Sequence, residues 1–112
     1  MHTEISQVDG ISIVRIQEKR IDAARASDFR AMFQELIQAG HRRIALDLSK
    51  VEFMDSSGLG ALVGGLKLMG DKGDLALFGV TGLVESLFRL TRMDKIFPIL
   101  GNEADTLDRL RT

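Results

Sequence analysis

Apolar and polar positions at the start of the chain follow the pattern of short strands. Residues 5–8 and 11–16 are runs rich in β-branched side chains, and Asp9-Gly10 separates them. Asp-Gly between two such runs is a typical hairpin turn. We therefore predict an antiparallel pair of strands at the start of the chain.

From Asp22 onward the apolar positions change to a helical spacing. One apolar stripe predicts a helix over about residues 24–39. The stripe consists of Phe29, Met32, Phe33, Leu36 and Ile37. Gly40 follows where helices commonly end with a left-handed residue. This helix therefore has one face to bury against another element.

Strand-like and helix-like segments alternate over the rest of the chain. Ile44, Leu46 and Leu48 alternate with smaller or polar neighbours, which indicates a central strand. A helix over about 57–72 and a strand over 75–78 follow. Thr81 can cap the next helix, which carries Val84, Leu87 and Phe88 on one face, and Pro98 suggests that the strand-like segment 96–100 lies at an edge. Asn102 and Asp105 can cap a last helix, which buries Leu107 and Leu110.

This order of elements indicates an α/β fold. Strands that alternate with helices form a largely parallel sheet through right-handed crossovers, and the opening hairpin makes the sheet mixed. We predict a sheet of four to five strands with about four helices. A length of 112 residues is usual for one domain, so we expect a single domain over residues 1–112.

Composition and charge exclude several classes of protein. Hydrophobic residues make up 45% and charged residues 28%, which is too apolar for a disordered chain. The net charge of −1 gives no general attraction to nucleic acid or anionic lipid. Residues 1–10 lack the apolar core of a signal peptide, and the apolar run 58–66 is about half as long as a membrane span. We expect a cytoplasmic protein with no direct nucleic acid or membrane partner.

Metal and cofactor sites lack the residues they need. The chain has no cysteine, and its two histidines, His2 and His41, fall in a terminus expected to fray and in an expected loop. Glycines in segment 58–65 approach two phosphate-loop patterns. Leu66 stands where a Walker loop requires lysine, and Val63 stands where the dinucleotide fingerprint requires glycine. We expect no cofactor, no metal and no enzyme activity.

The same glycines indicate close contacts of the apolar helix. Gly60, Gly64 and Gly65 fall in its interior and Gly58 at its start. Each interior glycine costs about 1 kcal/mol against alanine. Close packing of helix on sheet, where a side chain would clash, is the main interpretation. A flat surface that a partner backbone approaches is the second, and the two are compatible.

The most distinctive segment, residues 54–58, reads Met-Asp-Ser-Ser-Gly and lies between the central strand and the apolar helix. It lacks the first glycine of a nucleophile elbow, and neither histidine has a clear route to it as a base, which argues against hydrolase chemistry. Asp55, Ser56 and Ser57 all suit a helix cap, worth about 1 kcal/mol. One residue is enough for that role, so capping leaves spare hydroxyls.

Phosphorylation is the third interpretation of this segment. The turn follows a strand, at the edge where α/β sheets place functional groups. A phosphate there meets the positive end of the helix dipole and free N–H donors, so the fold tolerates about −1.5 to −2 units of new charge. A partner bound over the turn would not tolerate this added negative charge, particularly because Asp55 already lies there. Such a modification would switch binding and leave folding intact.

Residues 45–63, ALDLSKVEFMDSSGLGALV, resemble the signature of the STAS-domain anti-sigma-factor antagonists. The resemblance extends over nearly the whole chain. The matching positions are Asp47, Ser49, Val51, Phe53 and 54–60, with Ile21-Asp22 before the first helix and Leu87, Phe88, Leu90 and Met93 in a Leu-Phe-x-Leu-x-x-Leu segment.

The resemblance implies a STAS fold and a partner switch. In this family the unphosphorylated antagonist binds an anti-sigma factor that is also a serine kinase, and the sigma factor is released. The kinase phosphorylates the first serine after the aspartate, here Ser56, which ends binding, and a metal-dependent serine phosphatase resets the switch. The residues that the resemblance assigns to partner binding are Asp22, Asp55, Ser56, Ser57, Gly58, Leu59 and Gly60.

Several points leave alternatives open. Segment 18–20, Glu-Lys-Arg, replaces a glycine that the family often has near this position, so the rim of the surface differs in shape and charge. Arg25, Asp28 and Arg30 either set partner choice or form a solvated charged face, which is the simpler interpretation. The function has two alternatives: a non-phosphorylated STAS scaffold domain in a larger signalling assembly, and an antagonist in a switch controlling secretion, motility or biofilm growth.

Overall fold

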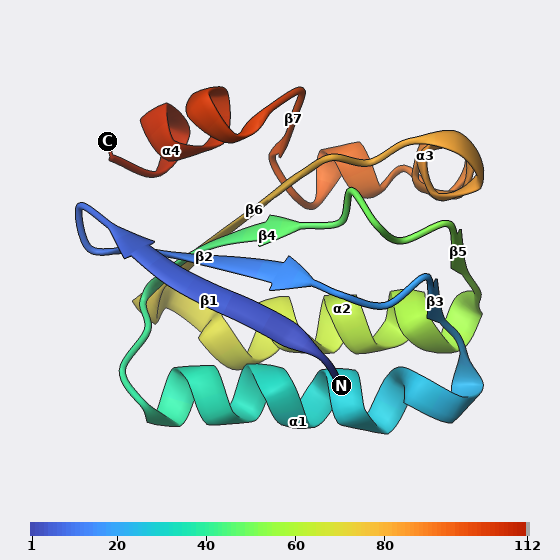
Figure 1. The fold of residues 1–112 in the computed structure, drawn as a ribbon, viewed down its shortest axis with the longest axis horizontal. Coiled ribbons are helices and arrows are strands. Elements are labelled where there is room, and N and C mark those ends of the chain that lie inside the picture. Colours follow the sequence, from blue (N-terminus) through green and yellow to red (C-terminus); the bar gives the residue numbers. More distant parts are fainter. Residues whose placement is uncertain (112) are drawn as a thin grey trace.

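The computed structural model describes residues 1–111, and Thr112 lies outside them. In chain order the elements are β1 (Thr3–Val8), β2 (Ile11–Ile16), β3 (Arg20–Ile21), α1 (Ala23–Gln38), β4 (Arg43–Asp47), β5 (Phe53–Met54), α2 (Ser56–Met69), the 3₁₀ turn η1 (Gly70–Lys72), β6 (Asp74–Phe78), α3 (Gly82–Leu90), the 3₁₀ turn η2 (Met93–Lys95), β7 (Ile99–Leu100) and α4 (Glu103–Arg111). Helices α1 and α2 cover one face of the central sheet, α4 covers the other, and α3 lies at one end (Figure 1).

The central sheet has five strands in the order β1-β2-β4-β6-β7. Strands β1 and β2 form an antiparallel hairpin, and β2, β4, β6 and β7 run parallel to one another. Strand β4 is central, as its apolar alternation predicts. The structure therefore confirms the α/β fold with a mixed, mostly parallel sheet, four helices and an opening hairpin.

Each face of the sheet has its own core because the middle strands bury side chains on both sides. On β2, Val14 and Ile16 join the core under α1 and α2. The alternate residues Ile11 and Ile13 join the smaller core under α4. The predicted stripe of α1 is confirmed in the larger core under α1 and α2, where Phe29 and Phe33 are fully buried.

Some predicted details differ from the structure. Helix α2 begins at Ser56 and ends at Met69, earlier at both ends than predicted. Thr81 occupies the N-cap position of α3, but its side chain makes no capping hydrogen bond, so that prediction is wrong. The predicted cap of α4 is confirmed, since Asn102 Oδ1 accepts from the N–H of Asp105 at 2.8 Å. His2, expected in a fraying terminus, is tied to the fold by its backbone: its N–H donates to Glu18 at 3.0 Å, and its carbonyl accepts from the N–H of Gln17 at 2.9 Å.

A second, two-stranded sheet was absent from the predictions. Strands β3 and β5 pair in parallel, with Arg20 opposite Phe53 and Ile21 opposite Met54. Two residues are too few to show a strand periodicity in the sequence. This small sheet lies at the end of the molecule where α1 and α2 begin (Figure 1). It therefore determines how the two helix starts are placed.

Candidate functional site

The two helix starts lie side by side because the small sheet aligns them. The parallel register of Ile21 with Met54 brings the next residues, Asp22 and Asp55, to the same edge. Asp22 is the N-cap of α1 and Asp55 is the N-cap of α2. The structure therefore brings together two aspartates that are far apart in the sequence.

The Asp55 carboxylate makes most of the contacts at this edge. Its Oδ1 accepts hydrogen bonds from the N–H groups of Ser57 and Gly58, both at 3.0 Å. Its Oδ2 accepts from the N–H of Ala23, the first residue of α1, at 3.2 Å. One side chain thus caps α2 and also holds the start of α1.

The Asp22 carboxylate lies among cations and a helix start. It accepts from the N–H of Ala24 at 3.2 Å, and it lies 3.5 Å from both Arg20 and Arg25. Partial burial raises the pKa of Asp22, but the hydrogen bond from Arg20 and the charge of Arg25 outweigh it, and the pKa lies below its usual value. Asp22 is therefore an ionised part of the site at neutral pH.

Ser56 is the first residue of α2 and is exposed, whereas Ser57 is half-buried. Within residues 1–111, neither serine hydroxyl forms a hydrogen bond to another residue, because the Asp55 carboxylate acts as the cap. The sequence leaves open which of the three residues caps the helix, and the structure assigns that role to Asp55. The Ser56 hydroxyl is left available to solvent.

One expectation about this turn needs correction. The sequence predicts free N–H donors for a phosphate, but Asp55 already accepts from the N–H groups of Ser57 and Gly58 through its side chain. Its carbonyl accepts from the N–H of Leu59 at 3.0 Å. A phosphate on Ser56 would therefore meet the helix dipole but find these three donors occupied.

The glycines of α2 have different roles along the helix. A β-carbon at Gly58 would overlap the carbonyl oxygen of Ile21, and one at Gly65 would overlap the ring of Phe33. Close packing is therefore confirmed for these two, although the neighbour of Gly65 is α1 and not the sheet. Gly60 has only the Arg30 guanidinium at 3.9 Å from such a β-carbon, and Gly64 has open space. These two contribute a flat surface instead.

The rim beside Asp22 carries the charged segment that departs from the family pattern. The Arg20 guanidinium carbon lies 4.3 Å from the centre of the Phe53 ring, a cation–π contact across the small sheet. Glu18 accepts from the N–H of His2 and pairs with Arg25 at 3.1 Å. The His2 N–H, followed by Arg25, lowers the pKa of Glu18. Arg25 therefore belongs to an ordered network rather than to a freely solvated face.

Exposed apolar side chains lie on α3, which packs against β5. Leu83 is 68% exposed and Leu90 is 82% exposed. They are seven positions apart, so they share one face of the helix. The family resemblance includes Leu90, while Leu83 was missed. The spacing of the two leucines, beyond the buried stripe of α3, is the signal that could have found it.

Between residues 1 and 111, no cluster of three or more His, Cys, Asp or Glu side chains is arranged to hold a metal ion. None of the helices in that range combines the length and the hydropathy that a membrane span requires. His41 lies in a loop, as predicted, and its Nδ1 is hydrogen-bonded to the Ser12 hydroxyl, which comes from β2 and not from the turn at Ser56.

Comparison with known proteins gives a consistent result. Residues 2–106 match the family model described as the STAS domain. The chain is 34% identical over 112 residues to an anti-sigma F factor antagonist of Paenibacillus polymyxa, covering 98% of this chain and 95% of that protein. An anti-sigma factor antagonist from Mycobacterium paratuberculosis has a similar crystal structure, with a TM-score of 0.89, 25% identity and coverage of 99% of this chain and 94% of that one. The Bacillus cell fate determinant SpoIIAA in its phosphorylated form shares the fold, with a TM-score of 0.68, 21% identity and coverage of 96% and 98%.

Proposed function

The chain belongs to the STAS-domain family of anti-sigma-factor antagonists, and on that premise we propose that it is a phospho-regulated partner switch. The unphosphorylated form binds an anti-sigma factor that is also a serine kinase, and this binding releases a sigma factor. Phosphorylation of Ser56 abolishes binding, and a serine phosphatase restores it. This switch operates in the cytoplasm, and the chain itself performs no catalysis.

The observation that carries the proposal is the position of the Ser56 hydroxyl. Ser56 is exposed at the first turn of α2, and the capping hydrogen bonds that a serine could supply there come from Asp55 instead. Removing or modifying this hydroxyl therefore breaks no hydrogen bond within residues 1–111. A hydroxyl that the fold does not use is suited to modification by another enzyme.

The surface around Ser56 is suited to a close partner contact. Gly60 is exposed and presents backbone without a side chain, and Leu59 is half-buried beside it. The exposed leucines of α3 add apolar area next to β5. Exposed apolar groups beside a flat backbone surface are typical of protein interfaces. We assign Asp22, Asp55 and residues 56–60 to this partner-binding surface.

The charges of the site explain why a phosphate would act on binding. Asp22 and Asp55 already place two carboxylates at the shared edge of the helix starts. A phosphate adds about −1.5 to −2 units of charge to the same edge. In the free protein, water solvates this charge. Under a partner it would be desolvated beside like charges, which is strongly unfavourable. A Bacillus protein of this fold has been solved in a phosphorylated form, which is consistent with the proposal.

The experiment begins with the Ser56→Ala variant as bait, because that variant stays in its binding-competent form. The kinase that it captures is then incubated with ATP and the unmodified protein, and mass spectrometry locates the phosphate. We expect one phosphate, on Ser56, and loss of binding to the captured kinase. A phosphate located elsewhere, or binding that phosphorylation does not weaken, would overturn the mechanism. Normal partner release by Ser56→Ala would favour the scaffold alternative.

A further inference from the structure

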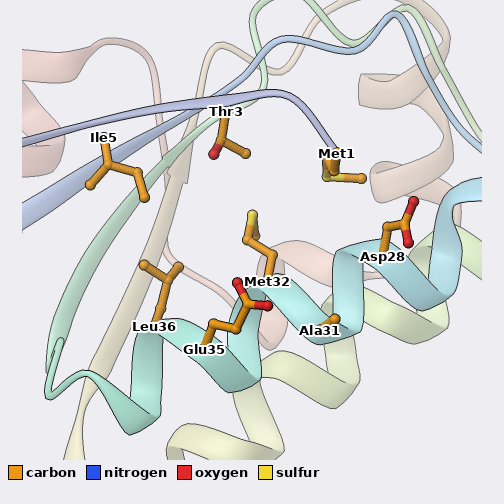
Figure 2. Close-up of a pocket in the computed structure, with 8 residues that line it drawn as sticks. All are labelled: Met1, Thr3, Ile5, Asp28, Ala31, Met32, Glu35 and Leu36. Atoms are coloured by element: carbon orange, nitrogen blue, oxygen red, sulfur yellow. The ribbon is translucent and has the colours of Figure 1, made fainter.

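Strand β1 and helix α1 form a groove that contains none of the residues assigned to the Ser56 surface. Its volume is ≈ 360 Å³. Thr3 and Ile5 line it from the strand, and Ala31, Met32 and Leu36 line it from the helix. Figure 2 shows the strand side chains directed toward α1 and the Met32 side chain directed toward β1. The groove therefore lies between a sheet edge and a helix, and its lining mixes apolar and polar side chains.

The backbone of β1 has one unpaired side. The N–H of Gln17 donates to the carbonyl of His2 at 2.9 Å, which makes these opposed residues a hydrogen-bonded pair. Hydrogen-bonded and non-bonded pairs alternate along an antiparallel ladder. By this alternation Thr3, Ile5 and Gln7 direct their N–H and carbonyl groups away from β2. No strand of the described residues pairs with that side, since β1 is the end of the sheet.

This edge carries little of the usual protection against strand pairing. Sheet edges are normally blunted by proline, by charged side chains (lysine above all), by a bulge or by a very short strand. Glu4 is the one charged side chain of β1. Strand β1 has six residues, TEISQV, paired with β2 without a bulge, and it contains neither proline nor lysine. The opposite edge strand, β7, has two residues. Ile5 on the β1 edge is 48% exposed. The two edges therefore differ in their capacity to accept another strand.

Two carboxylates flank the apolar part of the groove. Asp28 and Glu35 are both exposed, and within residues 1–111 neither forms an ion pair or a hydrogen bond through its side chain. They are seven positions apart on α1, which corresponds to about 10 Å along the helix. Met32 lies between them in sequence and faces the groove (Figure 2). The helix side of the groove therefore presents acid, apolar surface and acid in succession, and Met1 lines the groove at the Asp28 end.

We propose that this groove binds an extended segment of a partner protein that pairs with the outer side of β1 and directs basic, apolar and basic side chains toward α1. Same-face residues of a strand repeat about every 6.6 Å, so two lysines flanking one leucine span about 13 Å and their flexible side chains reach both carboxylates. Backbone pairing at an exposed edge combined with side-chain pockets is an established mode of peptide recognition. The inference does not depend on phosphorylation of Ser56.

A second copy of this chain fits the groove poorly. If two β1 strands paired, the side chains offered to the acidic groove would be Thr3, Ile5 and Gln7, none of which is basic. Pairing would also bring Asp28 and Glu35 of both copies to one interface. Like charges at an interface oppose association. The charge pattern therefore favours a basic partner segment over self-association.

The test uses the peptide acetyl-Thr-Lys-Thr-Leu-Thr-Lys-Thr-amide, titrated into the full chain and followed by ¹H–¹⁵N NMR. We expect shifts and slower hydrogen exchange at the amides of Thr3, Ile5 and Gln7. A double variant, Asp28→Asn with Glu35→Gln, should bind about fivefold more weakly, the effect of two exposed ion pairs. The matched control, Glu52→Gln with Asp71→Asn, removes the same charge from exposed positions outside β1 and α1 and should bind as the unmodified chain does.

Three results would overturn the proposal. The first is a set of shifts confined to residues outside β1 and α1. The second is an equal loss of affinity in the double variant and its control, which indicates general charge attraction. The third is a dimer of the free chain in sedimentation equilibrium that Ile5→Lys dissociates, which makes a second copy the occupant. A peptide with aspartate in place of both lysines should produce no shifts.

Discussion

The carboxylate of Asp55 accepts a hydrogen bond from the backbone N–H of Ala23 at 3.2 Å, so the cap of α2 also holds the first residue of α1. The same carboxylate accepts from Ser57 and Gly58 within its own helix. Its position follows from the pairing of β3 with β5, which brings the two helix starts to one edge. The arrangement leaves the Ser56 hydroxyl without a structural role, and the stability of the site depends on the aspartate.

Two substitutions of Asp55 separate its two roles. Asp55→Ala removes every acceptor and should lower the free energy of unfolding by about 2 kcal/mol, the sum of a cap and one further hydrogen bond. Asp55→Asn keeps one carbonyl oxygen for Ser57 and Gly58, but its amide nitrogen cannot accept from Ala23. We expect about half the loss, together with faster amide hydrogen exchange at Ala23. Urea denaturation and exchange NMR measure both. An asparagine variant as unstable as the alanine variant would contradict this division.

Gly58 and Gly64 form a matched pair for testing the glycines of α2. Gly58→Ala places a methyl group on the carbonyl oxygen of Ile21, a backbone atom held by the small sheet. We expect a loss of about 1–3 kcal/mol, typical of overpacking. Gly64→Ala meets open space, so the better helix propensity of alanine should stabilise the chain by up to about 1 kcal/mol. Thermal denaturation should show a lower melting temperature for Gly58→Ala and a higher one for Gly64→Ala. Equal changes in the two variants would contradict the assignment of close packing to Gly58 alone of this pair.

The elements that the sequence predicts well are those with strong local signals. The hairpin has a turn dipeptide between two β-branched runs, α1 has a stripe of five apolar residues, and Asn102 with Asp105 forms a cap within one turn. In each of these cases the interacting residues are close in sequence. Such segments can be interpreted without knowledge of the tertiary structure.

The features that sequence reasoning missed depend on contacts between distant segments. Strands β3 and β5 have two residues each, and Arg20 meets Phe53 only because those strands pair. The contact between Asp55 and Ala23 joins residues 32 positions apart. Thr81 is a feature that the sequence predicts and the structure lacks. It stands at the N-cap position of α3, but its side chain makes no capping hydrogen bond. The sequence motif therefore predicts the candidate site, and the small sheet explains its geometry.

The acid sensitivity of the fold should involve Glu18 and Asp22. Both carboxyl groups have a pKa below the usual value in the folded chain. The hydrogen bond from the His2 N–H, followed by Arg25, lowers the pKa of Glu18. Partial burial raises the pKa of Asp22, but Arg20 and Arg25 together lower it by more. A lowered folded-state pKa adds stability above the unfolded-state pKa, and that stability is lost as the pH falls through the folded-state value. We therefore expect the free energy of unfolding to decrease below about pH 4.5.

The variant Glu18→Gln tests this pH dependence. It should be less stable than the unmodified chain at pH 7, with a shallower decrease on acidification. The two curves should converge at acid pH, once the pH has fallen below the folded-state pKa of Glu18. Urea denaturation at a series of pH values measures the difference. Glu4→Gln, which removes an exposed carboxylate from β1, provides the control and should follow the unmodified chain. A constant difference between Glu18→Gln and the unmodified chain at all pH values would contradict the assignment.

In the proposed switch, phosphorylation of Ser56 should change binding far more than stability. The phosphate stands at the N-terminus of α2, where its effect on folding is about 1 kcal/mol or less and is favourable in sign, although Asp55 already occupies the nearest N–H donors. Under a partner the same phosphate is desolvated beside Asp55 and Asp22, which should weaken binding by several kcal/mol, or about a hundredfold or more. Differential scanning calorimetry of the phosphorylated and unphosphorylated protein measures the effect on stability. Isothermal titration calorimetry of the same two forms with the captured kinase measures the effect on binding. A large fall in melting temperature would show that the phosphate acts by disturbing the fold, because a surface switch at an unused hydroxyl has no structural contact to break.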